Sequence, residues 1–487
     1  MLQKFKKING LYLTTILSAL GAIFSFGVTF LLTHYLGENE ETRAILYGKI
    51  QYFIGIITTL TIFLKFGFVS FTVKKTQLEE DKKAVFSKVF FAFDIFSILI
   101  FPLFFIFSYF FLTRLNKDII LIILLFVASF FFSLTSLVSS FYLGKKHYKF
   151  SILIESIIPK VLQLLSFGTI IALRAYSFLA NNYVLLFSII YFIVSFPFIL
   201  VSIKKTKIHF SKVELLSIFV FFLISFESNA GNSLIKVLQG EFYISNNPEI
   251  QTQYDVMLGC LSLSLQIVSM GTIFVGVIAN IAKPHFALLA TKSNKDLVTF
   301  FKKTIRLSGY ISIPFMIAFF AESKQVMSFF GVSSYPIFLK ILSVYGLILA
   351  LGGPCGTLLE MSGLEKYELF SSAANLISFI GFSYLLKSVT PYSLPISLLI
   401  GTLIGKIMNL IFIRIKCKQN PIDYSGLIYL LIFGVVCFIA FSKISYIHNF
   451  YMWLVANIIL GISLIVFGFI FSPYKNDKYF FFQKTLI

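Results

Sequence analysis

The sequence predicts an all-α polytopic membrane protein with about fourteen transmembrane helices. Hydrophobic residues make up 58% of the 487 residues and charged residues only 13%, whereas a soluble domain carries about 25% charged residues. Long apolar runs recur along the whole chain and are continuous rather than alternating. Continuous runs predict helices, because backbone groups in lipid must bond within their own segment.

Fourteen runs come close to the length of about 20 apolar residues that a helix needs to cross the hydrocarbon. The first follows a short basic segment, but it is longer than the apolar part of a signal peptide and no A-x-A-like site follows it, so we expect it to remain as a membrane helix. In order, the runs cover residues 11–32, 46–71, 89–112, 119–143, 152–173, 182–202, 214–237, 254–281, 306–321, 337–359, 369–387, 393–413, 425–442 and 449–471.

Lysine and arginine are distributed unequally between alternate loops. With the N-terminus placed in the cytoplasm, the inner segments hold 28 of these residues and the outer segments hold 7. This bias is a positive-inside signal and predicts that both termini are cytoplasmic. It also accounts for most of the basic composition, so the net charge of +20 does not require nucleic acid as a partner.

Six further cations lie within the predicted spans, where a charge is costly and often functional. Lys65, Lys160 and Lys406 are candidates for cavity cations that contact an anionic substrate. The alternative for Lys65 and Lys406 is snorkelling to the membrane surface, and for Lys65 also an ion pair with Asp94. Lys160 has the alternative of a structural pair with Glu155. The other three lie near outer ends and are expected to be interfacial: Lys49, Lys236 and Lys340.

Three acidic residues also lie within the predicted spans. Asp94, Glu155 and Glu227 are candidates for ion coupling or for charge pairing with the lysines. Glu227 has Asn229 and Asn232 close by in the sequence and is the best candidate for a proton or sodium site. A buried carboxyl with satisfied hydrogen bonds is the equally weighted alternative.

A weak internal repeat divides the chain. The segments around FLLTHYLGENE (30–40) and SLIKVLQGEFY (233–243) each end a helix, precede a tyrosine at the start of the next helix, and are followed by a basic inner segment. The period is about six helices, so both copies have the same orientation, as in transporters built from two bundles around a cavity. The predicted parts are an N-terminal lobe (1–208, helices 1–6), a C-terminal lobe (209–419, helices 7–12), and helices 13–14 with a cytoplasmic tail (420–487).

Motifs of catalysis and metal binding are absent from the sequence. It contains no G-x-S-x-G, Walker-type or H-E-x-x-H pattern, and its four cysteines and five histidines form no ligand spacing. We therefore expect no enzymatic activity, cofactor or metal. The stretch LVTFFKKTI (297–305) is read as a short amphipathic helix on the membrane surface, or as a solvated linker.

The segment 283–335 resembles the polysaccharide flippases of the multidrug/oligosaccharidyl-lipid/polysaccharide (MOP) exporter superfamily. The likeness extends over most of residues 10–415. The matching features are Pro284 closing a helix, a basic linker, Pro314 within the next helix, Phe330-Gly331, Tyr335, the turn 362–366, and Leu36-Gly37 with Gly48. The sequence departs from the family at Lys65-Phe66-Gly67, where the residue just before the glycine is often acidic or neutral. It departs again at Asn232 and Lys236, where an Asp-Arg pattern is common.

The resemblance implies two pseudo-symmetric six-helix bundles around a central cavity plus two C-terminal helices. It implies a flippase of the bacterial inner membrane that moves undecaprenyl-pyrophosphate-linked oligosaccharide units to the outer leaflet by alternating access, for surface polysaccharides such as O-antigen. Implied partners are the lipid-linked substrate, membrane lipids, a polysaccharide polymerase and glycosyltransferases, with Na⁺ or H⁺ as coupling ions. Two alternatives stay open: a cation-coupled multidrug antiporter of the same superfamily, and a membrane glycan polymerase that does not transport.

Overall fold

The computed structural model describes residues 23–474 and the isolated residues 17, 20 and 21. Its gaps are residues 79, 146, 203–209, 213, 217, 220–221, 223–236, 239, 246, 445–446 and 448–449. The described chain forms two compact units, Met1–Gly259 and Cys260–Ile487. This division by contacts differs from the lobe boundary at 208–209 that the repeat predicts, and the repeat-based lobes stay a prediction.

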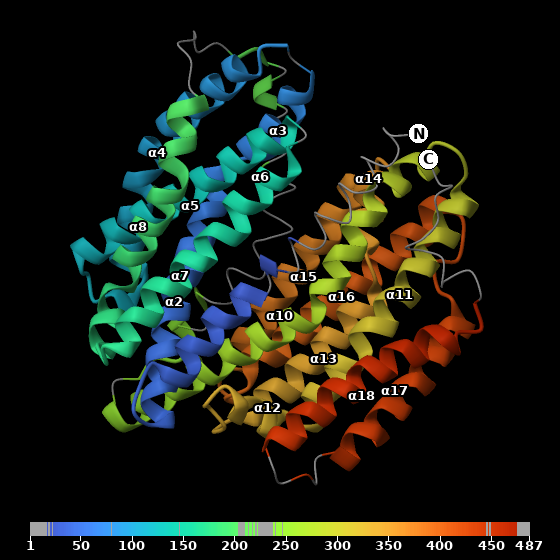
Figure 1. Cartoon of the computed structure of the whole chain (residues 1–487). Helices are drawn as coiled ribbons and strands as arrows, with labels where there is room; N and C mark the ends of the chain where they lie inside the picture. The colour runs from blue at the N-terminus through green and yellow to red at the C-terminus, as the bar shows by residue number, and fades with distance from the viewer. Residues whose placement is uncertain are drawn as a thin grey trace. The chain divides into compact units, whose positions relative to one another are not determined.

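Unit 1 is a helical bundle in which α5 packs between α2 and α8 (Figure 1). Asn39 begins α2 by accepting a hydrogen bond from the Thr42 amide at 2.8 Å, and Glu40 and Glu41 stand in its first turn. Both features stabilise a helix N-terminus. The helices are α2 (Glu40–Lys65), α3 (Phe68–Leu78), α4 (Lys82–Phe111), the 3₁₀ turn η1 (Thr113–Leu115), α5 (Ile119–Gly144), α6 (Tyr148–Ile152), the π-helical turn η2 (Leu153–Ile157), α7 (Ile158–Ala172) and α8 (Tyr176–Ser202).

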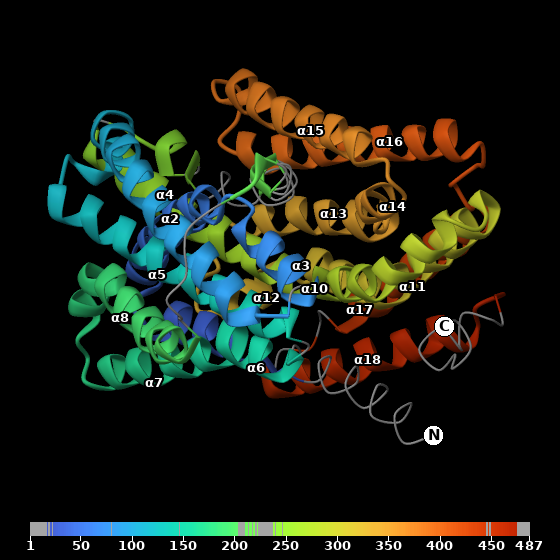
Figure 2. The same ribbon diagram turned by 90° about the horizontal axis from the view of Figure 1, so that it is seen from above.

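Unit 2 is built around α11, which packs against α13, α17 and α18, while α15 and α16 lie side by side (Figure 2). A Cβ atom at Gly401 would lie 2.7 Å from the Asn375 carbonyl oxygen of α15, so this glycine permits the close approach of the two helices. The helices are α10 (Pro248–Ala290, which begins in unit 1), α11 (Asn294–Ala321), α12 (Ser323–Phe329), α13 (Pro336–Gly352), α14 (Cys355–Met361), α15 (Glu365–Leu386), α16 (Ser393–Cys417), α17 (Tyr424–Ile444) and α18 (Phe450–Ile470).

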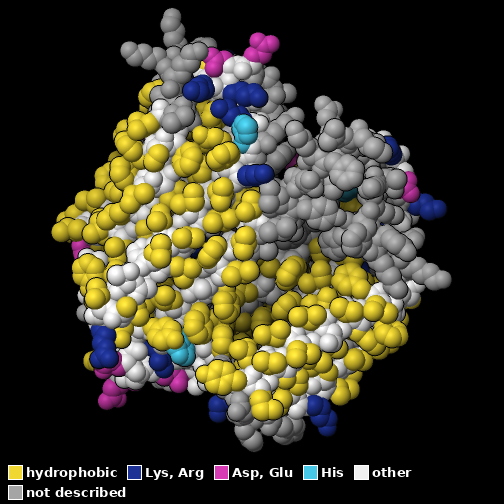
Figure 3. Space-filling model, viewed as in Figure 1, with side chains coloured by type: hydrophobic (Ala, Val, Ile, Leu, Met, Phe, Trp, Pro, Cys, Tyr) yellow, Lys and Arg dark blue, Asp and Glu magenta, His cyan; other side chains and the backbone are white. Residues whose placement is uncertain are grey.

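The predicted all-α polytopic fold is confirmed. Twelve helices of the described chain are long and apolar enough to span a membrane, and the shorter apolar helix Ile23–Tyr35 overlaps the second half of the first predicted span. The predicted span 214–237 falls mostly outside the described residues. Figure 3 shows hydrophobic side chains covering the middle of one face and charged side chains gathered towards its ends, the distribution expected of a protein that crosses a bilayer.

Several predicted helices differ from the structure. The predicted spans 46–71 and 337–359 are each divided into two helices, at residues 66–67 and 353–354. The helix expected to close at Pro284 continues as α10 to Ala290. The amphipathic stretch 297–305 is also not a surface helix, because it forms the first turns of α11 and buries Leu297, Val298 and Phe301 in a core with Ala282 and Cys355. Its apolar face packs on protein rather than on lipid.

Candidate functional site

Lys65 is the last residue of α2 and stands at a helix break. Phe66 and Gly67 follow with positive φ angles of 33° and 77°. A Cβ atom at Gly67 would lie 2.1 Å from the Ile218 carbonyl oxygen, so only glycine fits here. The break places the ammonium group of Lys65 at a helix C-terminus, where the helix dipole favours a cation.

The Lys65 side chain is half-buried, and its Nζ atom lies 5.4 Å from the centre of the Phe132 ring on α5. It interacts electrostatically with Glu155. No residue in the described part of the chain accepts a hydrogen bond from it. A half-buried ammonium group without an acceptor retains its capacity to bind an oxyanion.

Glu155 lies in the π-helical turn η2, immediately before α7. Its two carboxylate oxygens accept hydrogen bonds from Ser136 at 3.2 Å and from Ser139 at 2.8 Å, and Ser139 also contacts the Ser151 hydroxyl at 2.8 Å. Proline at position 159, just inside α7, lacks the amide hydrogen that a regular helix would use. The carboxylate is thus held by hydroxyl groups of α5 and interacts electrostatically with Lys65.

The structure does not bring all the predicted residues together. Lys160 donates a hydrogen bond to Gln163 on its own helix at 3.1 Å. Asp94 forms no ion pair with Lys65 among the described residues. Glu227, with Asn229 and Asn232, lies outside the described residues. Among the described residues, the predicted site residues Lys65 and Glu155 interact electrostatically.

Asp94 lines a separate groove of about 640 Å³ between α4, α5 and α8. The Oδ1 atom of its carboxyl is buried and has no hydrogen-bond partner in the described chain. The two serines of the groove, Ser97 and Ser195, donate to carbonyls of their own helices. The remaining lining is apolar and rich in aromatic rings: Phe90, Phe101, Phe126, Phe130, Phe131, Phe192 and Phe196, with Ile98, Val127, Leu134 and Ile199.

In unit 2, Lys406 of α16 contacts the residues at the second helix break, between α13 and α14. Its Nζ atom donates to the Gly353 carbonyl at 2.9 Å and lies 3.5 Å from the Cys355 sulfur. Gly353 has a φ angle of 57°, and its carbonyl is one that a continuous helix would have bonded internally. Lys406 therefore satisfies a backbone carbonyl that the break between α13 and α14 leaves without a partner in the helix.

Two acceptors near Lys406 were missed from the sequence. Glu368 interacts electrostatically with Lys406, yet its Oε2 atom is buried without a hydrogen-bond partner in the described chain, as is Oδ1 of Asn409. The sequence placed Glu368 one residue before a predicted span, beside the turn 362–366, so it was not counted among the intramembrane acids. The helix start of α15 at Glu365 brings it into the bundle.

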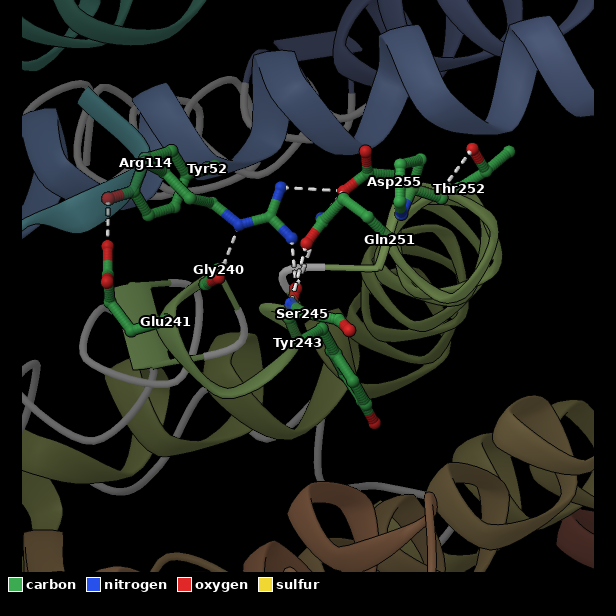
Figure 4. Close-up of polar contacts among 10 residues, drawn as sticks. Tyr52, Arg114, Gly240, Glu241, Tyr243, Ser245, Gln251, Thr252 and Asp255 are labelled. Carbon is green, nitrogen blue, oxygen red and sulfur yellow. Dashed lines mark hydrogen bonds and ion pairs between the residues drawn. The ribbon is translucent and has the colours of Figure 1, made fainter. Parts of the chain in front are cut away.

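A polar contact joins the segment before α10 to the loop after α4 (Figure 4). Arg114 donates to the carbonyl oxygens of Gly240 and Tyr243 and pairs with the Asp255 carboxylate at 2.8 Å. Tyr52 donates to Glu241 at 2.5 Å. All of these residues belong to unit 1. The sequence places this end on the outer side.

Two glycines allow α2 and α10 to approach each other closely. A Cβ atom at Gly259 of α10 would lie 2.0 Å from the Ala44 carbonyl oxygen of α2, and one at Gly48 would lie 2.8 Å from the Gly259 amide nitrogen. The backbones of α2 and α10 therefore touch directly. The sequence identified Gly48 through family resemblance and gave no signal for Arg114 beyond its count as an outer cation.

An ion pair between α11 and the residue before α17 stabilises unit 2. Arg306 of α11 contacts the Asp423 carboxylate at 2.5 Å, and its guanidinium lies 3.7 Å from the centre of the Tyr474 ring. The Tyr474 hydroxyl donates to the other Asp423 oxygen at 3.2 Å. Burial would raise the pKa of Asp423, but the Gly426 amide and the Arg306 charge together hold it below its usual value.

Comparison with known structures identifies the fold. A lipid II flippase MurJ in an inward closed conformation matches with a TM-score of 0.69 at 16% identity, over 96% of this chain and 99% of that chain. An inward-facing multidrug resistance MATE family transporter of the MOP superfamily matches with a TM-score of 0.63 at 14% identity, over 82% of this chain and 94% of that chain.

A third structure is that of a MOP superfamily transporter from Pyrococcus furiosus, described as having a binding pocket of reversed polarity. It matches with a TM-score of 0.53 at 15% identity, over 86% of this chain and 97% of that chain. No curated protein sequence matches the chain.

A family model gives the more specific result. Residues 46–337, more than half of the chain, match the model of a family described as polysaccharide biosynthesis proteins. The likeness to MurJ and the MATE transporters at 14–16% identity establishes the shared fold. The chain therefore belongs to the polysaccharide biosynthesis protein family and has the fold of the MOP exporter superfamily.

Proposed function

We propose that this protein is a flippase for oligosaccharides carried on undecaprenyl pyrophosphate, and that it moves them from the cytoplasmic to the outer leaflet of a bacterial inner membrane. The family match to polysaccharide biosynthesis proteins supports this proposal, as does the fold shared with a lipid II flippase. The positive-inside bias supports the expected orientation, with both termini in the cytoplasm.

The ammonium group of Lys65 is the main structural support for the proposal. A diphosphate that crosses the hydrocarbon needs a cation to offset its charge, and Lys65 offers an ammonium group with no hydrogen-bond acceptor among the described residues. Its present electrostatic partner, Glu155, is held by Ser136 and Ser139. A diphosphate that binds here accepts hydrogen bonds from the ammonium group of Lys65, while the two serines continue to stabilise the Glu155 carboxylate.

The Arg114 contact supports a conformational cycle. If the end of the bundle that holds Arg114 is the outer one, its bonds to Gly240, Tyr243 and Asp255 close unit 1 on that side in this conformation. Delivery of the substrate to the outer leaflet then requires these bonds to break. The small residues Gly48 and Gly259 make that closure tight, because the helix backbones touch there.

Transport is tested with a charge-removing substitution at Lys65. In a host whose own flippase is deleted, Lys65→Met should abolish surface polysaccharide and cause lipid-linked units to accumulate in the inner leaflet, at unchanged protein level. Lys49→Met is the matched control, because Lys49 lies near the start of the same helix and donates to Asn181 at 3.1 Å. Normal export by Lys65→Met would refute the role of this lysine.

Ligand recognition is tested separately with purified protein in nanodiscs. We expect undecaprenyl pyrophosphate to bind and undecaprenol, which lacks phosphate, to bind much more weakly. The difference should shrink in Lys65→Met and persist in Lys49→Met. Equal binding of both lipids to the unsubstituted protein would remove the diphosphate from the proposal.

Efflux of organic cations is the second candidate function, favoured by the Asp94 groove. Aromatic rings and a single carboxyl together suit a lipophilic cation, and the groove volume of about 640 Å³ lies in the range of small-molecule sites. Under this alternative, expression should protect cells against cationic dyes, and Asp94→Asn should remove the protection. Unchanged dye sensitivity on expression would eliminate it.

Partners and coupling follow from the same proposal. A polysaccharide polymerase on the outer side and glycosyltransferases on the inner side would consume and supply the substrate. Proton or sodium coupling would use Asp94, Glu155 or Glu227, and Glu155 is the one that interacts electrostatically with Lys65. Loss of ion-dependent transport in Glu227→Gln, with retention in Asp94→Asn, would assign coupling to Glu227.

A further inference from the structure

Glu322 connects α11 to α12 in unit 2 and is completely buried, with 0% of its surface exposed. One carboxyl oxygen, Oε2, accepts hydrogen bonds from the Trp453 indole at 2.6 Å and from the Asn457 amide at 2.9 Å. Both donors belong to α18. Glu322 is therefore the polar connection between this helix and the corner formed by α11 and α12.

The other oxygen, Oε1, is buried and has no hydrogen-bond partner among the described residues. No ion pair to Glu322 occurs in the described part of the chain. The described helix α18 carries no charged residue of its own. Charged residues on the surrounding helices that do not pair with Glu322 are Lys324 of α12, Lys340 of α13, Lys443 of α17, and Lys295, Asp296, Lys302, Lys303 and Arg306 of α11.

A carboxylate in this position would be a buried charge with two neutral donors on one oxygen and none on the other. Burying an uncompensated charge costs far more than burying a neutral acid whose hydroxyl lacks an acceptor. Burial accordingly raises the pKa of Glu322, although donation by Asn457 and Trp453 acts in the opposite direction. The neutral acid keeps the carbonyl oxygen that Trp453 and Asn457 need.

We propose that Glu322 is a proton-binding site and that its neutral form holds α18 against the α11–α12 corner. The direction of the pH dependence follows from a folded-state pKa above the ordinary value. The contact is strongest at low pH, where the acid is neutral, and weakens as rising pH ionises Glu322. The role requires no substrate, so it is independent of the proposed transport function.

The protein contains its own reporter, because Trp453 is its single tryptophan and donates directly to Glu322. Tryptophan fluorescence and its quenching by acrylamide are measured on the full-length protein in nanodiscs from about pH 4 to about pH 9, a range that brackets the ordinary carboxyl pKa. We expect one transition with its midpoint above the ordinary glutamate pKa, with Trp453 more accessible to acrylamide on the alkaline side.

Glu322→Gln mimics the neutral acid and should lose the transition, with Trp453 shielded at every pH. Glu365→Gln is the control, because Glu365 is an exposed carboxyl on α15 and should leave the transition unchanged. Asn457→Ala gives an independent check, since removal of a donor disfavours the carboxylate and should move the midpoint to higher pH. A flat profile in the unsubstituted protein, or the same transition in Glu322→Gln, would overturn the proposal.

Discussion

A lysine stands beside a helix break in each compact unit, and the two lysines use their charge differently. Lys65 ends the helix that breaks, and its ammonium group lies over the Phe132 ring with Glu155 as its electrostatic partner. Lys406 comes from a neighbouring helix and donates to the Gly353 carbonyl, which has no partner in the broken helix. Lys406 thus satisfies a backbone carbonyl, whereas Lys65 has no hydrogen-bond acceptor in the described chain.

This difference separates a structural charge from a candidate binding charge. Removing a donor from a buried acceptor leaves that acceptor unsatisfied, so the structural lysine should matter for stability. A cation without an acceptor contributes little to the fold and retains its affinity for an anion. Depth in the membrane, the criterion available from the sequence, does not distinguish the two.

The largest expected effect concerns the breaks themselves. Gly67→Ala should prevent stable folding, at a cost above about 3 kcal/mol, because its Cβ atom would meet the Ile218 carbonyl at 2.1 Å in a left-handed backbone conformation. Gly353→Ala would place its Cβ atom 2.7 Å from Cγ1 of Ile305 at a positive φ of 57°. It should also destabilise the fold, but less than Gly67→Ala, because the nearest atom belongs to a side chain rather than to the backbone. Yield of monodisperse protein in detergent measures both. Equal yields would show that the two breaks are equally permissive.

Lys65→Met should act on binding rather than on stability. Loss of one charge-assisted hydrogen bond, worth about 1.5–3 kcal/mol, should weaken undecaprenyl pyrophosphate binding by about 10–100-fold. Thermal unfolding should be little changed. A large drop in thermal stability with unaltered lipid affinity would give Lys65 the structural role assigned here to Lys406.

Lys406→Met should show the reverse pattern. It keeps the methylene groups that pack near Gly352 but leaves the Gly353 carbonyl without its donor, at a cost of about 1–3 kcal/mol. All four cysteines are buried and lie in unit 2, so a thiol-reactive dye reports the unfolding of this unit during heating. An unchanged melting curve would contradict a structural Lys406.

The smallest effect is expected from Glu155→Gln. The amide keeps a carbonyl for one serine but removes the negative charge beside Lys65, so lipid diphosphate should bind a few-fold tighter, an effect of about 0.5–1 kcal/mol. Titration of the lipid into nanodiscs containing each variant measures it. Weaker binding would mean that Glu155 orients Lys65 for the ligand instead of competing with it.

Hydropathy predicted the all-α fold well, because each span is a continuous apolar run. It could not predict the breaks at 66–67 and 353–354, since the residues on both sides are apolar and a hydropathy window does not register backbone conformation. Gly67 and Gly353 are compatible with a break, because glycine readily adopts a positive φ. Phe66 also adopts a positive φ of 33°, which the sequence does not predict. The turn lies against the backbone of Ile218, a tertiary contact that the local sequence does not show.

The candidate site was predicted in composition but not in pairing. Lys65 and Asp94 lie at similar depth on neighbouring helices, so the sequence suggested an ion pair. Depth does not fix the direction in which a side chain points around the helix axis. In the structure, the electrostatic partner of Lys65 is Glu155 rather than Asp94. Glu322 directly follows the predicted span 306–321, and no pattern in the sequence indicates that its carboxyl is buried.

The wide turn Leu153–Ile157 holds one residue more than a regular α-helical turn would. If this extra residue moved along the helix, every side chain it passed would rotate by about 100°, the angle between successive residues of an α-helix. Glu155 would then turn away from Ser136 and Ser139 without any change in the ends of the helix. A local shift of register could thus change the charge facing Lys65 while the rest of the bundle stays packed.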